Sequence, residues 1–124
     1  MNKSDKIITA SVMSGMDISI KEKETSTSDN MTTVFLFGKP CIRVNRDRYT
    51  VSIDGRTVGS RKSSRLINSV LSSITNVKVA NRGGKWYLLS CEDKHMQEFT
   101  DREVEVPLIK EALAEKTSQT FKNF

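Results

Sequence analysis

The chain has 124 residues, with 20 lysines and arginines against 15 aspartates and glutamates, which gives a net charge of +5. This length supports one hydrophobic core rather than two. The longest apolar run, residues 34–37, is far too short to span a membrane. The polar first residues lack the apolar core of a signal peptide. We therefore expect a small cytoplasmic protein that does not enter a membrane.

The first 31 residues carry two short structural signals. Residues 8–12 alternate apolar and polar side chains, and residues 18–20 repeat the pattern. A period of two is typical of a half-buried strand. Residues 21–30 contain no apolar side chain and predict a solvated loop or linker. We therefore expect residues 1–31 to be flexible or to form a short hairpin.

A hairpin follows in the next part of the chain. Residues 32–37 are rich in strand-forming side chains, and residues 41–44 and 49–53 predict two paired strands joined by a turn. In the second of these, Tyr49 shares a predicted core face with Val51. The dipeptide after residue 53 is a strong turn signal.

The clearest helix signal is an apolar stripe with a period of 3.6 residues, formed by Leu66, Ile67, Val70, Leu71 and Ile74. Ser60, Ser63 or Ser64 can provide the N-cap oxygen of this helix. Strands are expected from residue 77 and over residues 85–90, on either side of a Gly-Gly turn. Pro107 is suited to open a closing helix, because its missing N–H is not needed there.

Together these signals predict an α+β domain over residues 32–124. It consists of an antiparallel sheet, one packed central helix in a ββαββ order, and a C-terminal helix. The expected core is Ile42, Val44, Tyr49, Val51, Ile53, Leu66, Ile67, Val70, Leu71, Val77, Val79, Trp86 and Leu88.

Positive charge is concentrated in the middle of the chain. Residues 39–65 hold eight basic and two acidic side chains, a net charge of +6, so the other 97 residues sum to −1. Six of the eight are arginines, whose planar guanidinium grips phosphate well. The candidate binding residues are Arg43, Arg46, Arg48, Arg56, Arg61, Lys62 and Arg65.

A clustered basic face is the electrostatic footprint of polyanion binding. Nucleic acid is therefore the leading partner, and the alternative is an acidic protein surface. A solvated face that serves only solubility is the third interpretation. The sequence does not distinguish DNA from RNA as the partner. It also leaves open whether the chain forms a homodimer.

Aromatic side chains that read unpaired bases are sparse here, with eight in the whole chain. Tyr87 is the best candidate, because its strand neighbours Trp86 and Leu88 are expected to face the core. A half-exposed strand residue without a binding role is the alternative for Tyr87.

The chain lacks the patterns of common catalytic and metal sites. Its single histidine, His95, lies in a polar stretch, and Cys41 and Cys91 stand fifty positions apart without a CxxC motif. No Walker loop, G-x-S-x-G or H-E-x-x-H motif is present. We therefore expect no enzyme activity, no cofactor and no metal, and two reduced, half-buried thiols, with a disulfide as the alternative only if the strands that carry them are neighbours.

Several segments resemble a small domain of unknown function found in tailed-bacteriophage proteins. The similar segments are Phe35-Leu36-Phe37-Gly38, the hairpin with Ile42 and Val44, residues 57–68, Val77-Lys78-Val79 and Trp86-Tyr87-Leu88. The similarity spans roughly residues 34–100. The resemblance implies a ββαββ order, a phage origin and action by binding in the host cytoplasm. The bound partner would be nucleic acid, or a host protein that is inhibited or redirected.

Overall fold

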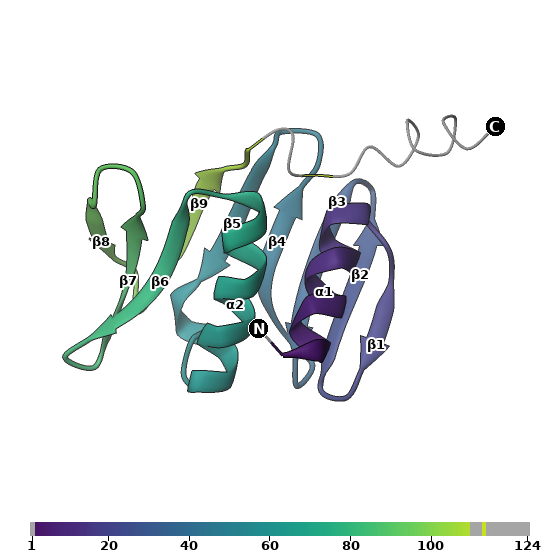
Figure 1. Ribbon diagram of the computed structural model, residues 1–124, viewed down its shortest axis with the longest axis horizontal. Helices are drawn as coiled ribbons and strands as arrows, with labels where there is room; N and C mark the ends of the chain where they lie inside the picture. Colours follow the sequence, from purple (N-terminus) through teal and green to yellow (C-terminus); the bar gives the residue numbers. More distant parts are fainter. Residues whose placement is uncertain (1, 110–112, 114–124) are drawn as a thin grey trace.

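The computed structural model describes residues 2–109 and Leu113. It confirms an α+β chain with antiparallel sheets (Figure 1). No helix among the described residues is long and apolar enough to cross a bilayer. The elements in chain order are α1 (Lys3–Ser14), β1 (Ile18–Ile20), β2 (Lys23–Ser28), β3 (Met31–Leu36), β4 (Lys39–Asn45), β5 (Thr50–Asp54), η1 (Gly55–Thr57), α2 (Arg61–Ile74), β6 (Val77–Arg82), β7 (Lys85–Ser90), β8 (Met96–Glu98) and β9 (Glu103–Pro107).

The main sheet has six strands in the order β1-β2-β3-β4-β5-β9, and every neighbouring pair is antiparallel. Strands β1 to β5 form a meander, because each follows its neighbour through a short turn. Strand β9 returns from the end of the described chain to pair with β5, with Val51 opposite Val106. The sheet alternates buried and more exposed side chains along β3 and β5, which is typical of a sheet covered on one side.

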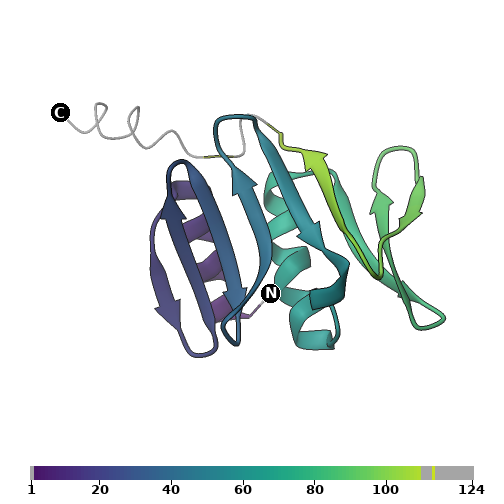
Figure 2. The ribbon, with the colours of Figure 1, turned by 180° about the vertical axis from the view of Figure 1, so that it is seen from behind.

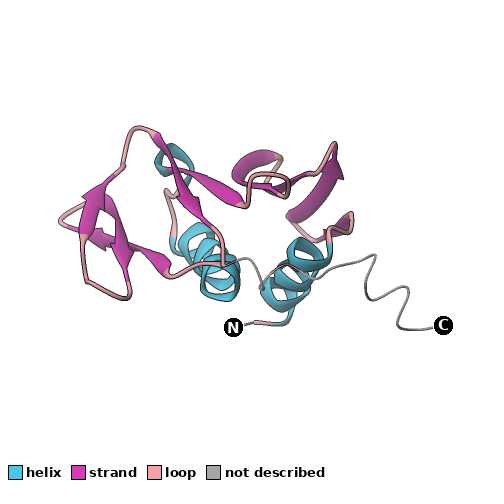
Figure 3. Ribbon diagram, turned by 90° about the horizontal axis from the view of Figure 1, so that it is seen from above, coloured by secondary structure: helices cyan, strands magenta, loops and turns pink. Residues whose placement is uncertain are grey.

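Both helices lie on the same face of this sheet (Figure 3), and the opposite face carries no helix (Figure 2). The core between the two layers includes Val34 and Ile42 from the strands, Ile8 from α1, and Leu66 and Leu71 from α2, all at most 1% exposed. Burial of this apolar surface is the main favourable contribution to the stability of the fold.

Helix α1 corrects the prediction of a strand over residues 8–12. Ile8 and Val12 are fully buried while Ala10 is exposed, so the apolar side chains follow helical rather than strand spacing. Asn2 caps the first turn with its side-chain oxygen, 2.8 Å from the backbone nitrogen of Asp5. Gly15 ends the helix at φ +71. Five residues of alternation are too few to distinguish the strand period of two from the helix period of 3.6. The capping residues Asn2 and Gly15 could have been recognised from the sequence.

Residues 21–30 are also not a linker. Most of them form β2, whose polar side chains pair with β3. Lys23 lies on the helix-facing side and is 3% exposed, and its Nζ is 2.5 Å from Asp5 Oδ1 of α1, itself 1% exposed. Breaking one partner of a buried ion pair is strongly destabilising. This contact ties α1 to the sheet.

The first three strands after α2 form a separate sheet in the order β6-β7-β8. Asn68 of α2 fastens β6 with two hydrogen bonds, from its Nδ2 to the Val79 carbonyl at 3.0 Å and from the Val79 N–H to its Oδ1 at 2.8 Å. The backbone of Phe99 then joins β7 to the last turn before β9, through a bond to the Trp86 carbonyl at 3.0 Å. Phe99 is fully buried and fills the junction between the sheets.

Most of the expected core is confirmed. Val77 and Trp86 are partly buried against it, but Tyr49 is 40% exposed. Its φ of +54 places it in the turn before β5, so the strand alternation does not extend to it. Pro107 ends β9 rather than opening a helix, and nearly all of the expected C-terminal helix lies outside the described residues.

We predict that Ile8→Ala lowers the free energy of unfolding by about 2–5 kcal/mol, because it leaves a cavity under α1. Chemical denaturation followed by circular dichroism measures this. Met16→Ala is the matched control, since Met16 follows the same helix but is exposed; it should change stability by less than about 0.5 kcal/mol. Equal stability of the two variants would contradict the packing of α1.

Candidate functional site

The fold divides the basic residues of the 39–65 segment between opposite ends of the main sheet. Arg48 precedes β5 and Arg56 follows it. A five-residue strand is roughly 17 Å long, so the two side chains start that far apart. Arg43 projects from the sheet face without helices, where its register partner is Ser52. The single patch expected from the sequence is therefore not formed.

Arg46 has a structural role. Its guanidinium donates to the carbonyls of Val12 at 2.7 Å and Met13 at 2.9 Å, the last carbonyls of α1, and to Thr32 Oγ1 at 3.1 Å. Burial lowers the pKa of Arg46, but an arginine stays charged in proteins. A cation at the C-terminal end of a helix is favoured by the helix dipole. Arg46 is therefore withdrawn from the candidate binding set.

Two other candidates form exposed ion pairs. Arg43 Nη1 is 2.9 Å from Glu103 Oε2, and Arg56 binds the Asp54 carboxylate through two nitrogens at 2.9 Å each. The bond to Arg56 lowers the pKa of Asp54. Exposed pairs contribute little to stability, but these two offset each cation with a nearby acid. Arg43 and Arg56 are weaker candidates than their charge alone suggests.

Arg61, Lys62 and Arg65 remain together at the start of α2. Ser60 caps this helix, with its Oγ 3.1 Å from the backbone nitrogen of Ser63. Apolar residues from Leu66 onward face the core, so the basic side chains of the first turns are left on the exposed side. The first N–H groups of a helix have no acceptor within it, and they favour anions.

Both helices begin at the same end of the molecule, beside the β1–β2 and β3–β4 turns (Figure 1). Lys62 Nζ is 3.0 Å from Glu22 Oε1 in the first of these turns, and this hydrogen bond lowers the pKa of Glu22. A small polar hollow of about 280 Å³ joins the turn, the α1 start and Lys62.

This end combines five basic side chains of the 39–65 segment with two lysines from the N-terminal part of the chain. We call it the basic end, and its cations are Lys3, Lys21, Lys39, Arg56, Arg61, Lys62 and Arg65. Its acids include Glu22 and Asp54, which are paired with Lys62 and Arg56, and Glu103 and Asp101 lie close enough to act on Arg56 as well. Within the described part of the chain, no ion pair engages the other five cations.

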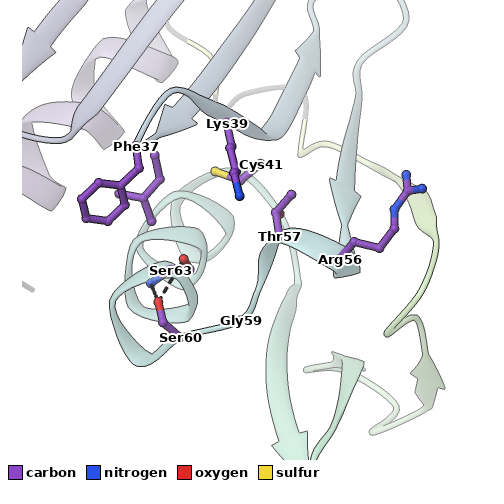
Figure 4. Close-up of a pocket in the computed structure, with 9 residues that line it drawn as sticks. Phe37, Lys39, Cys41, Arg56, Thr57, Gly59, Ser60 and Ser63 are labelled. Atoms are coloured by element: carbon purple, nitrogen blue, oxygen red, sulfur yellow. Dashed lines mark hydrogen bonds between the residues drawn. The ribbon is translucent and has the colours of Figure 1, made fainter.

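A second hollow of about 280 Å³ opens at this end between the β3–β4 turn and the start of α2 (Figure 4). Its lining combines apolar, basic and hydroxyl groups: Leu36, Phe37, Lys39, Cys41, Arg56, Thr57, Gly59, Ser60 and Ser63. This volume is slightly below the ~300 Å³ at which pockets for drug-sized ligands begin. The hollow is suited to one small group, such as a phosphate or a single ring, rather than to a large cofactor.

Both cysteines are free, but their environments differ. Cys41 lines this hollow, and burial raises its pKa to about 12. Its Sγ is 3.4 Å from the Val34 carbonyl. A thiol that stays protonated at neutral pH is a poor nucleophile, so Cys41 serves packing. Cys91 is exposed rather than half-buried.

Phe37 is an exposed aromatic residue that the sequence analysis did not single out. Its side chain is 67% exposed at the tip of the β3–β4 hairpin, and Lys62 Nζ lies 5.5 Å from the ring centroid. The sequence did contain a signal for this exposure. The alternation that buries Val34 and Leu36 leaves residue 37 off the buried face, and Gly38 directly after it marks the turn.

Tyr87, the aromatic residue that the sequence favoured, lies elsewhere. It is half-buried on β7, opposite Ala80 and Glu98, on the outer face of the three-stranded sheet. The same face holds a separate hollow of about 340 Å³ lined by Lys78, Arg82, Leu89, Ser90, Cys91, Lys94 and Met96. Tyr87 is therefore not part of the basic end.

No protein-family model, curated protein or solved structure matches the chain.

We predict that Arg46→Ala destabilises the protein by about 1–3 kcal/mol, because it removes charged hydrogen bonds from the end of α1. Urea unfolding measures the change. Arg48→Ala is the matched control, since it removes the same charge from an exposed position in the same turn, and it should have little effect. If Arg46→Ala leaves the free energy of unfolding unchanged, the cap does not contribute to stability.

We also predict that a thiol reagent at about pH 8 modifies one cysteine quickly in the native chain and two after denaturation. The raised pKa and burial of Cys41 protect it, whereas Cys91 is exposed. Absorbance of the released thiolate counts the reacted groups. Cys91→Ser should abolish the fast reaction, and two fast thiols in the folded protein would contradict the burial of Cys41.

Proposed function

We propose that the chain is a non-enzymatic nucleic-acid-binding protein that contacts phosphates through its basic end. The observation that carries the proposal is that this end gathers Lys39, Arg61 and Arg65, three cations without an ion pair among the described residues. Cations that neutralise phosphates release the counterions condensed on the nucleic acid, and this release drives binding.

The backbone at this end supports the same proposal. The first turn of α2 directs its N–H groups toward the side where these cations lie, and α1 begins nearby. Cations at a helix start are mildly unfavourable, by about 0.3–1 kcal/mol at exposed positions. An approaching phosphate would turn both features into favourable ones, since it is attracted by the N–H groups and by the side chains.

The proposal changes the residues expected from the sequence. Arg61, Lys62 and Arg65 stay in the binding set, and Lys39 joins them. Arg46 leaves it because it caps α1. An acidic protein is the alternative partner for the same cations, and a phage origin remains an expectation from the resemblance alone.

We predict that the triple variant Lys39→Ala, Arg61→Ala, Arg65→Ala weakens binding to nucleic acid and flattens its salt dependence by up to about three phosphate contacts. Each contact contributes a log–log slope of about −0.9 on duplex DNA and about −0.7 on a single strand. Fluorescence anisotropy across a salt series, starting near 50 mM, measures both quantities. Lys62 is left in place because its loss would leave Glu22 unpaired.

The matched control is the triple variant Arg48→Ala, Lys78→Ala, Lys94→Ala. It removes the same charge from exposed positions away from the basic end and should bind nearly as the parent chain does. If the control loses affinity instead, the interface lies away from the basic end, at the β4–β5 turn or on the outer face of the β6–β8 sheet. If the parent chain binds no nucleic acid near 50 mM salt, the proposal is wrong, and weak salt dependence toward an acidic protein would support the alternative.

A further inference from the structure

Phe37 occupies a position that bulky residues rarely adopt. The two-residue turn between β3 and β4 consists of Phe37 at φ +52 and Gly38 at φ +76. Turns with positive φ at both positions favour asparagine, aspartate or glycine, and a bulky side chain there is disfavoured by steric strain. The conformation keeps the ring out of the core, at 67% exposure, the highest among the large hydrophobic side chains described as exposed.

The ring is nevertheless held in place. The Phe37 N–H donates to the Glu22 carbonyl at 2.8 Å, which fixes the hairpin tip against the β1–β2 turn. Lys62 contacts the ring from α2, with its Nζ 5.5 Å from the centroid, and is itself bound to the Glu22 carboxylate at 3.0 Å. A cation at this distance from an aromatic ring is attracted by the ring face. Phe37 is therefore an anchored rather than a loose surface residue.

The surroundings of the ring combine apolar, basic and hydroxyl groups. Phe37 lines the 280 Å³ hollow together with Lys39 and Ser60. Figure 4 shows Phe37 and Lys39 extending from the hairpin toward the start of α2. Gly59, on the far wall, has no atom within 4 Å of where a Cβ would stand, so that side is open. A flat ring bound against Phe37 would thus have Lys39 of the same hollow and Lys62 beside the Phe37 ring near its attached phosphates.

We propose that Phe37 is a stacking platform for an unpaired base, so that the ligand of the basic end is a single-stranded nucleic acid. This inference rests on the proposed function. Exposed aromatic rings beside cations are how single strands are bound without sequence preference, and each stacked base makes a large contribution to affinity. Bases in a duplex are already stacked on one another and are not available to Phe37.

The test compares three labelled probes of about 15 nucleotides: oligothymidine, an abasic strand of equal length, and a duplex. The abasic strand keeps the phosphates and removes the bases. The parent chain should bind oligothymidine more tightly than the other two. Phe37→Ala should lose about 5- to 100-fold in affinity for oligothymidine and almost none for the abasic strand, with an unchanged salt slope.

Two further variants control for folding and for aromatic character. Phe37→Tyr keeps the ring and should bind as the parent chain does. Tyr49→Ala removes another exposed aromatic residue, which also has positive φ but lies in the β4–β5 turn, and it should bind normally. Thermal unfolding of each variant verifies that the fold is intact.

The inference is overturned if Phe37→Ala binds oligothymidine as tightly as the parent chain, or if the parent chain binds the abasic strand equally well. In either case, if the triple variant of Lys39, Arg61 and Arg65 still binds nucleic acid more weakly than the parent chain, the proposed phosphate contacts are supported. If the parent chain binds none of the three probes, the proposed function and this inference are both wrong.

Discussion

Burial of the apolar face of the six-stranded sheet is the constraint that shapes the rest of the molecule. A sheet with one apolar face must cover it, and here α1 and α2 do so side by side (Figure 3). Each helix is tied to the strands by a polar contact at a defined position. For α1 this is the buried pair of Asp5 and Lys23 of the main sheet, and for α2 it is the two hydrogen bonds between Asn68 and Val79 of β6, in the three-stranded sheet. Hydrophobic burial contributes the stability, while these polar contacts fix the placement.

The arrangement of the helices determines where charge accumulates. Both helices start at one end, so two sets of free N–H groups and two strand turns lie together there. Lysines that are distant in the sequence, Lys3, Lys21 and Lys39, join the arginines of α2. At the other end Arg46 is consumed in capping α1. The molecule therefore has one basic end with few opposing acids, although its overall charge is modest.

The same end combines features that cost stability. Positive φ at Phe37, an exposed ring and cations beside helix starts are each unfavourable in the isolated protein. Strain and exposure of this kind cluster at functional sites in proteins. Their coincidence within the two turns and the first turn of α2 is the physical reason for assigning binding to this end rather than to the helix-free face of the sheet. On that face, Arg43 is balanced by Glu103.

The sequence by itself determined the α+β class, the helix from Leu66 and most of the core, because those depend on local periodicity and capping. It did not determine α1, since a five-residue alternation fits two periods, nor the pairing of β9 with β5, since strand partners far apart in sequence leave no local pattern. The candidate site also needed the tertiary structure. The density of charge along the sequence placed Arg46 and Arg61 in one patch. In the structure β5 runs between them and carries them to opposite ends of the main sheet. Which cations form an ion pair or a cap is decided only by the packing of the elements.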